Sequence, residues 1–293
     1  MVAALLTLLG ALLVYYLFYF IRDLVKNKGN WGNGSWLISG AIGFVTDFLD
    51  TLGVGSFAPT TMLLEITKQL DDDRHLPGVL NISHAIPVMM EAFIFITVVK
   101  VAPLTLFSLV VAAIAGSFIG SKFVTKLPER KVQFFMGCAL IVTAILMALR
   151  QLGMLDLLGA GNEATALTGG ALVIGIVGNF ILGSLMTIGV GLYAPCMAMV
   201  YMLGMSPLVA MPIMMGSCAG LMPVASANFI KTGDYNRKVS LGITIGGIIG
   251  VIIAAKFVTG LDIEVLTWII IVVVIYSGIT YIRKGLQPAR VAE

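Results

Sequence analysis

Two nine-residue segments of this chain are nearly the same, and their glycines and prolines predict places where a helix is broken. Residues 51–59 read TLGVGSFAP and residues 187–195 read TIGVGLYAP, so six of the nine positions are identical. The Gly-x-Gly pairs of the two segments are Gly53 with Gly55 and Gly189 with Gly191. Glycine lets a helix unwind and lets backbone approach a ligand, and a proline suits the first turn of a new helix. The start of such a helix presents unpaired N–H groups and the positive end of its dipole, which together can bind an anion.

Polar side chains close to both segments could add hydrogen-bond donors to this anion site. They follow each glycine pair or lie in the next apolar segment of the chain. The predicted substrate-binding residues, besides the four glycines, are Ser56, Thr60, Thr61, Ser83, His84, Tyr193, Cys196, Ser217 and Asn228. Glycine, proline and small polar residues also allow close helix packing in membranes, which is the alternative interpretation. Recurrence of the pattern at matching positions favours the binding site.

Ionisable residues inside apolar sequence are costly and are therefore candidates for function. In this chain they are Asp47, Asp50, His84 and Glu91. Asp47 and Asp50 are three residues apart and share one helix face. A carboxylate beside an anion repels it unless it is protonated or paired, so Asp47, Asp50 and Glu91 are predicted ion-coupling residues for H⁺ or Na⁺. The alternative is that the two aspartates reach water or cap a helix end.

Composition places all these residues in a membrane protein. Hydrophobic residues make up 59% of the 293 residues and charged residues only 11%, against roughly 25% charged residues in soluble domains. The mean hydropathy is +1.02. Uncharged runs long enough, or nearly long enough, to cross a bilayer occur at residues 2–21, 101–121, 132–149, 240–255 and 265–282. We therefore expect a polytopic α-helical protein whose main partner is the lipid bilayer.

The elements that must position the matched segments form two repeats. A second matched pair, KFVTKL at 122–127 and KFVTGL at 256–261, follows at almost the same offset. We predict an extra N-terminal transmembrane helix in residues 1–30, repeat one at 36–151 and repeat two at 166–285. The expected segments, with approximate bounds, are 2–22, then 36–51, 53–66, 79–99, 102–122 and 131–149, then 166–186, 188–204, 208–229, 239–258 and 264–282. Each repeat is thus a broken pair of short helices plus three spanning helices.

Five segments per repeat is an odd number, so successive repeats must have inverted topology. With this count, 15 of the 18 Lys and Arg residues fall on one side of the membrane. Cytoplasmic loops carry an excess of Lys and Arg. The distribution predicts a multi-pass protein of the cell (inner) membrane with its C-terminus in the cytoplasm and its N-terminus outside.

At residues 36–285 the chain resembles the sulfite exporter TauE/SafE family of bacterial-type membrane permeases. The family has two repeats, each with a glycine-rich turn that leads to a proline, and the matches are Gly53-Val54-Gly55 through Pro59 and Gly189-Val190-Gly191 through Pro195. The small-residue helix and short basic loop of the family resemble residues 115–131 and 247–262. The triple glycine of the family is reduced here to a Gly-x-Gly pair. The resemblance implies export or uptake of small sulfur-containing anions such as sulfite or organosulfonates.

These observations predict a secondary transporter of a small anion, a sulfur oxyanion or organosulfonate, that works by alternating access, with proton coupling as a hypothesis. An anion channel of the same architecture is the alternative. No Walker-type ATP motif occurs, and a membrane enzyme would need converging catalytic groups that the few embedded acids and one embedded histidine do not supply. We expect no catalytic residues, no cofactor, no metal site and no nucleic-acid partner. The sequence carries no expectation about the oligomeric state.

Overall fold

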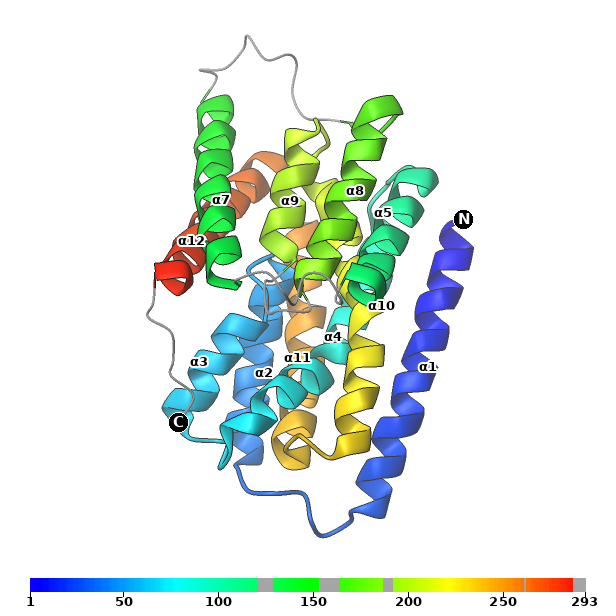
Figure 1. The fold of residues 1–293 in the computed structure, drawn as a ribbon, viewed down its shortest axis with the longest axis vertical. Coiled ribbons are helices and arrows are strands. Elements are labelled where there is room, and N and C mark those ends of the chain that lie inside the picture. The colour runs from blue at the N-terminus through cyan, green and yellow to red at the C-terminus, as the bar shows by residue number, and fades with distance from the viewer. Residues whose placement is uncertain (121–128, 153–163, 187–191, 261, 287–293) are drawn as a thin grey trace.

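The computed structural model describes residues 1–120, 129–152, 164–186, 192–260 and 262–286, and these residues fold almost entirely into helices (Figure 1). The helices are α1 (Val2–Lys26), α2 (Trp36–Thr51), α3 (Phe57–Thr67), α4 (Leu76–Val98), α5 (Pro103–Ala115), α7 (Glu129–Gln151), α8 (Gly169–Met186), α9 (Tyr193–Met202), α10 (Pro207–Thr232), α11 (Arg237–Thr259) and α12 (Ile263–Leu286). A π-helical turn at Gly116–Gly120 continues α5. These bounds lie close to the eleven predicted segments, and the first KFVT copy lies outside the described residues.

Six of the described helices are long and apolar enough to cross a membrane: α1, α4, α8, α10, α11 and α12. Two shorter apolar helices, at residues 103–119 and 133–149, accompany them. The short helices α2, α3 and α9 belong to the broken segments. The predicted all-α polytopic membrane protein is confirmed.

The loops gather at two opposite ends of the molecule. At one end, the loop before α2, the α3–α4 loop and the α10–α11 loop are joined by hydrogen bonds, such as Ser35 N–H to Gln69 Oε1 at 2.8 Å and Asn236 Nδ2 to the Asn33 carbonyl at 3.0 Å. At the other end, Ala102 N–H donates to the Thr165 carbonyl at 2.9 Å and Ser206 N–H donates to the Ala164 carbonyl at 3.0 Å. In Figure 1, α2 accordingly starts at the lower end and α8 at the upper end.

Helices of one predicted repeat pack on helices of the other, and exchanging the two repeats gives the same pairings. Helix α2 packs on α11, and its counterpart α8 packs on α5, while α4 pairs with α10 and α7 pairs with α12. A methyl group on Gly250 of α11 would collide with the carbonyl of Phe44 in α2, and one on Gly116 would collide with the carbonyl of Phe180 in α8. Phe44 and Phe180 are spaced like the two TxGVG copies, and Gly116 and Gly250 like the two KFVT copies. One close contact therefore occurs twice between equivalent residues, which supports the predicted inverted repeats.

Close backbone approach at the α2–α11 interface makes its glycines intolerant of substitution. A Cβ on Gly43 would collide with the backbone of Ile243, which cannot move aside as a flexible side chain does. We expect Gly43→Ala to destabilise the folded state by about 1–3 kcal/mol, because overpacking forces the helices apart. The measurement is the melting temperature of the purified protein in detergent. Gly10→Ala on α1 is the control, since nothing lies within 4 Å of that position, and an equal loss in both variants would contradict close packing as the cause.

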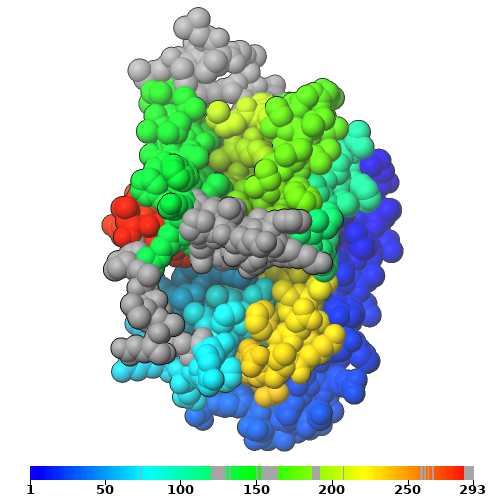
Figure 2. All heavy atoms as spheres, viewed as in Figure 1, coloured from blue at the N-terminus to red at the C-terminus, as the bar shows by residue number. Residues whose placement is uncertain are grey.

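The extra helix α1 lies along one side of the molecule, and in Figure 2 it forms the blue edge beside both halves. It packs on α10, α4 and α5. Its C-terminal end is fixed by Asp23, which accepts hydrogen bonds from Arg237 Nε and from the Tyr235 hydroxyl, each at 2.6 Å. Farther along α1, the buried Tyr16 hydroxyl donates to the Ile82 carbonyl of α4 at 2.9 Å. Helix α1 is thus attached to α4 and to the α10–α11 turn.

Candidate functional site

The first matched segment breaks the chain between α2 and α3. Gly53 and Gly55 have φ angles of 93° and 86°, in the left-handed region that favours glycine. Residues 52–54 fold back so that Gly53 N–H donates to the Asp50 carbonyl at 2.7 Å. Helix α3 then begins at Phe57, with Pro59 in its first turn. The sequence pattern thus produces the predicted end of one half-helix and start of another.

The second matched segment separates α8 from α9. Gly189 and Gly191 lie in residues 187–191, outside the described residues. Helix α8 ends at Met186 and α9 begins at Tyr193, with Pro195 in its first turn. The described residues on both sides therefore match the arrangement around the first segment.

The N-terminal ends of α3 and α9 open onto one cavity of about 110 Å³, enough for several water molecules or one small solute. Ser56, Phe57 and Ala58 line it from α3, and Leu192, Tyr193 and Ala194 line it from α9. Neither helix start has a hydrogen bond from a capping side chain. The N–H groups of the first turn and the positive helix ends are therefore available to a ligand in this cavity.

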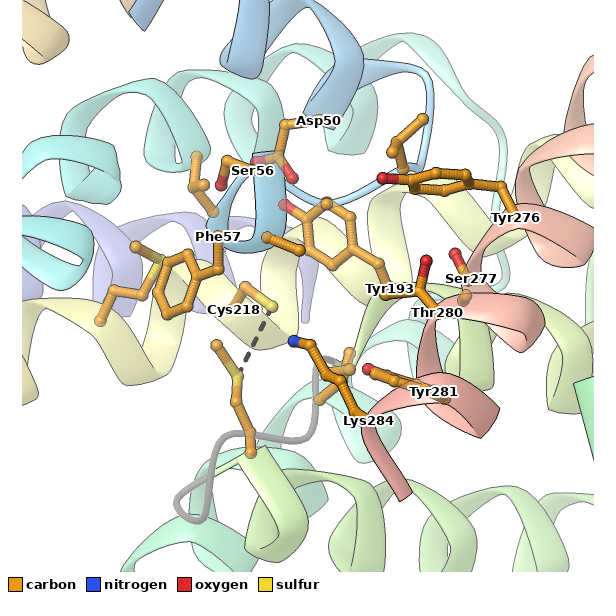
Figure 3. Close-up of a pocket in the computed structure, with 18 residues that line it drawn as sticks. Asp50, Ser56, Phe57, Tyr193, Cys218, Tyr276, Ser277, Thr280, Tyr281 and Lys284 are labelled. Carbon is orange, nitrogen blue, oxygen red and sulfur yellow. Dashed lines mark hydrogen bonds between the residues drawn. The ribbon is translucent and has the colours of Figure 1, made fainter. Parts of the chain in front are cut away.

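The wall contributed by α12 carries a polar stripe that the sequence analysis did not identify. Its residues are Tyr276, Ser277, Thr280, Tyr281 and Lys284. Figure 3 shows the Lys284 ammonium group directed from α12 into the space between the wall and Cys218. These residues are spaced three or four apart over two turns, so they lie on one face of α12. This spacing of polar residues in an apolar helix is the sequence pattern that could have revealed them. Lys284 adds a full positive charge to the two helix ends.

Asp50 is the acidic residue of the cavity lining. Its side chain is 2% exposed and its Oδ2 atom has no hydrogen-bond partner. Ser56, which comes just before α3, lies beside Asp50 in the cavity lining (Figure 3), so a charged Asp50 lies at the positive end of α3. The cavity therefore combines cationic and anionic groups rather than cationic ones alone.

Asp47 and His84 form a fully buried pair behind the cavity. Asp47 Oδ1 and His84 Nδ1 are 2.7 Å apart, and the opposite ring nitrogen, Nε2, lies 3.0 Å from Thr60 Oγ1. The second carboxylate oxygen of Asp47 lies against Gly247 of α11, where a Cβ would collide with it. The triad links α2, α3 and α4 but does not line the cavity, so it is placed to hold the half-helices in position rather than to contact substrate.

Glu91 connects the two halves of the molecule. It is fully buried on α4 and accepts a hydrogen bond from Thr51, the last residue of α2, at 2.7 Å. Its second carboxylate oxygen accepts a hydrogen bond from the Tyr193 hydroxyl at 3.1 Å. Tyr193 is the first residue of α9, so one carboxylate contacts both broken segments.

Of the predicted site residues, Asp50, Gly55, Ser56 and Tyr193 line the cavity. Gly53 is buried against Met197, and Thr60 bonds to His84. Thr61, Ser83 and Ser217 each bond to a carbonyl in their own helix, and Cys196 is buried. Asn228 is exposed near the end of α10, so the structure does not bring it to the cavity. In the described part of the chain, no three or more His, Cys, Asp or Glu residues are grouped to hold a metal ion.

Comparison with known families adds an independent observation. The family model for the sulfite exporter TauE/SafE matches residues 1–147 and, overlapping with these, residues 79–281. No curated protein and no solved structure matches the chain. Because the family model matches nearly the whole length, the chain belongs to the sulfite exporter TauE/SafE family, a family of membrane transporters of sulfur-containing anions.

Proposed function

We propose that this protein is a secondary transporter that carries one small sulfur oxyanion or organosulfonate, such as sulfite, through alternating exposure of the cavity between α3 and α9. The observation that carries the proposal is that two half-helix starts from opposite repeats open onto one cavity beside Lys284. Helix ends and a lysine are the groups with which proteins commonly bind oxyanions.

The cavity also suits the shape of such a substrate. Its polar groups are confined to the helix starts, Asp50 and the α12 stripe, while Val88, Met186 and Met222 supply apolar surface. A sulfonate or sulfite group would accept hydrogen bonds from the N–H groups of Ala58 and Ala194, and a small organic substituent would contact the apolar side. This division favours compact anions over polyanions.

Inverted repeats provide the two access states that a carrier needs. In many transporters the substrate site lies between inverted repeats, at broken helices, and one repeat rocks against the other. The paired packing of α2 with α11 and of α8 with α5 gives each repeat an equivalent contact with the other. We propose that exchange between these equivalent arrangements exposes the cavity to each side in turn.

Counterflow distinguishes this carrier from an anion channel of the same architecture. Proteoliposomes loaded with unlabelled sulfite should transiently accumulate external labelled sulfite, and the rate should saturate with concentration. A channel gives flux without counterflow. Flux of labelled sulfite with no counterflow would sink the carrier mechanism, and absence of any protein-dependent flux would sink the proposed function.

The contribution of the backbone can be tested with Ala194→Pro. Proline is tolerated in the first turn of a helix, but it removes one N–H group from the cavity wall. We expect sulfite binding about 5- to 100-fold weaker, because a hydrogen bond to a charged group contributes about 1.5–3 kcal/mol and substrate can partly shift toward the α3 end. Ala194→Ser keeps the N–H and is the control. Binding by calorimetry that is equal in both variants would exclude the Ala194 N–H group as a ligand.

We also propose the orientation expected from the basic residues, with the C-terminus in the cytoplasm and the N-terminus outside. Support comes from the loop end that contains Lys28, Lys68 and Arg74, which is joined by hydrogen bonds to the turn before Lys238. A reporter enzyme active only in the cytoplasm, fused after residue 293, should be active. An inactive C-terminal fusion with an active N-terminal fusion would reverse the assignment.

A further inference from the structure

The strongest unexplained feature of the core is an excess of buried acid. Asp47, Asp50 and Glu91 are 0–2% exposed, and among the described residues His84 is the basic side chain that contacts one of them, Asp47. His84 bonds to Asp47, so among the described ion pairs none includes Asp50 or Glu91. A buried carboxylate without a counter-charge is expensive.

The atoms around these two carboxylates form a set of oxygen ligands. The Asp50 Oδ2 atom is buried, has no partner and lines the cavity. Thr51, the residue after Asp50, donates its hydroxyl to Glu91 at 2.7 Å, and Ser56 lies beside Asp50 in the cavity lining (Figure 3). The C-terminal end of α2, whose last carbonyls carry partial negative charge, lies at the same place. Hard oxygen ligands of this kind, next to an interrupted helix, bind Na⁺ or H⁺ in transporters.

We propose that Asp50 and Glu91 form a binding site for one monovalent cation, a sodium ion or a proton, whose occupancy is required for anion binding in the adjacent cavity. This inference rests on the proposed function of that cavity. The cation and the anion then move together, as symported species.

The hydrogen bonds explain why the two sites depend on each other. A charged Asp50 lies beside Ser56 at the positive end of α3 and so competes with a substrate anion for that end. Glu91 accepts a hydrogen bond from the hydroxyl of Tyr193, and Tyr193 is the first residue of α9. A cation bound at this site balances the negative charge of Asp50, which is the charge that competes with the substrate, and leaves both helix starts to the substrate.

The equivalent positions of the second repeat do not carry these groups. The positions equivalent to Asp50, Ser56 and Glu91 are Met186, Leu192 and Ala225. By the same offsets, Cys196 is the residue equivalent to Thr60, and Cys218 is the residue equivalent to His84. The inverted repeats have therefore diverged, and repeat one alone carries the acidic groups.

Other titratable groups surround the site, and their contribution to the pH dependence of sulfite binding must be separated from that of Asp50. They are Asp47 on α2, His84 on α4, Tyr193 on α9, Cys218 on α10 and Lys284 on α12. Comparison of the wild type with Asp50→Asn at each pH removes their contribution, and it also removes the change in charge of sulfite itself.

The decisive experiment measures sulfite affinity as a function of the cation. Purified protein is titrated with sulfite in Na⁺ or N-methylglucamine buffer at fixed pH, and then from pH 5.5 to 8.5 at fixed Na⁺. We expect either saturating Na⁺ or saturating H⁺ to raise sulfite affinity about 5- to 150-fold, the usual range of coupling between two sites. Asp50→Asn and Glu91→Gln should lose this dependence. Glu65→Gln, which changes an exposed carboxylate of α3, should keep it.

The outcomes separate this inference from the proposed function. Sulfite binding that is indifferent to Na⁺, and whose pH dependence is the same in wild type and Asp50→Asn, overturns the cation site but leaves the transporter. If sulfite does not bind at all, the proposed function fails, and the melting temperature decides the cation site. If Na⁺ or acid raises the melting temperature of the wild type but not that of the Asp50→Asn/Glu91→Gln double variant, the cation site is supported. An identical change in melting temperature in both proteins overturns it.

Discussion

Replacement of Lys284 by glutamine is expected to weaken sulfite binding about 10- to 100-fold and to reduce counterflow in proportion. Lys284 carries the positive side chain of the cavity lining, and its ammonium group points into the cavity (Figure 3). A hydrogen bond to a charged group contributes about 1.5–3 kcal/mol, and each 1.4 kcal/mol is tenfold in affinity. Glutamine retains most of the length and one donor but not the charge. Sulfite affinity by calorimetry is the measurement.

The neighbouring residue provides a matched control. Arg283 is exposed on α12 and does not line the cavity. Arg283→Gln removes the same formal charge one residue away and should leave sulfite affinity within about twofold, because exposed charges are screened by water and salt. Equal losses in the two variants would show that net charge at this end of α12, rather than a contact in the cavity, attracts the anion.

The second large effect is expected in folding rather than in binding. His84→Leu removes the partner of the fully buried Asp47 carboxylate, which has no other hydrogen bond from a side chain in the described structure. Breaking a buried pair by removal of one member costs about 3–5 kcal/mol. At about 2–4 °C per kcal/mol in large domains, the melting temperature should fall by about 10 °C.

A double variant tests the cause of that loss. Asp47→Ala/His84→Leu removes both members of the pair and should recover at least half of the lost melting temperature, since no unpaired carboxylate remains. Asp23→Asn, at an acidic residue outside this pair, should cost much less, because Asp23 is partly exposed at the end of α1. A double variant that is less stable than His84→Leu would show that Asp47 and His84 contribute mainly through packing.

The helices and the broken segments could be predicted because local patterns determine them. Apolar runs, the Gly-x-Gly pairs and the prolines of the first turns specify where α2 ends and where α3 and α9 begin. The glycine contacts between α2 and α11 could not be predicted, because a glycine in an apolar helix shows that something lies close but not which helix it is.

The candidate site was predicted only in part, for physical reasons that differ between residues. Gly55, Ser56 and Tyr193 were found because they belong to the repeated motif. Lys284 is one of the 15 Lys and Arg residues that the sequence analysis counted on the cytoplasmic side, since a lysine near a helix end usually reaches water. Asn228 was included from its position in a polar stretch, but that stretch turns toward the surface near the end of α10.

The acids were identified as unusual, yet their partners depend on tertiary structure. Spacing predicted that Asp47 and Asp50 share a face of α2. It could not show that one bonds to His84 of α4 while the other meets Ser56 at the start of α3. The bond from Tyr193 to Glu91 joins residues 102 positions apart, and no local pattern indicates it.

The location of a bound anion tests the account most directly. Selenite has the shape and charge of sulfite, and its selenium atom can be located by anomalous scattering in crystals grown with it. We expect one selenium peak in the cavity, within hydrogen-bond distance of backbone N–H groups at the start of both α3 and α9 and of the Lys284 ammonium. A peak at any other position, or an empty cavity in crystals of protein that binds selenite in solution, would contradict the account.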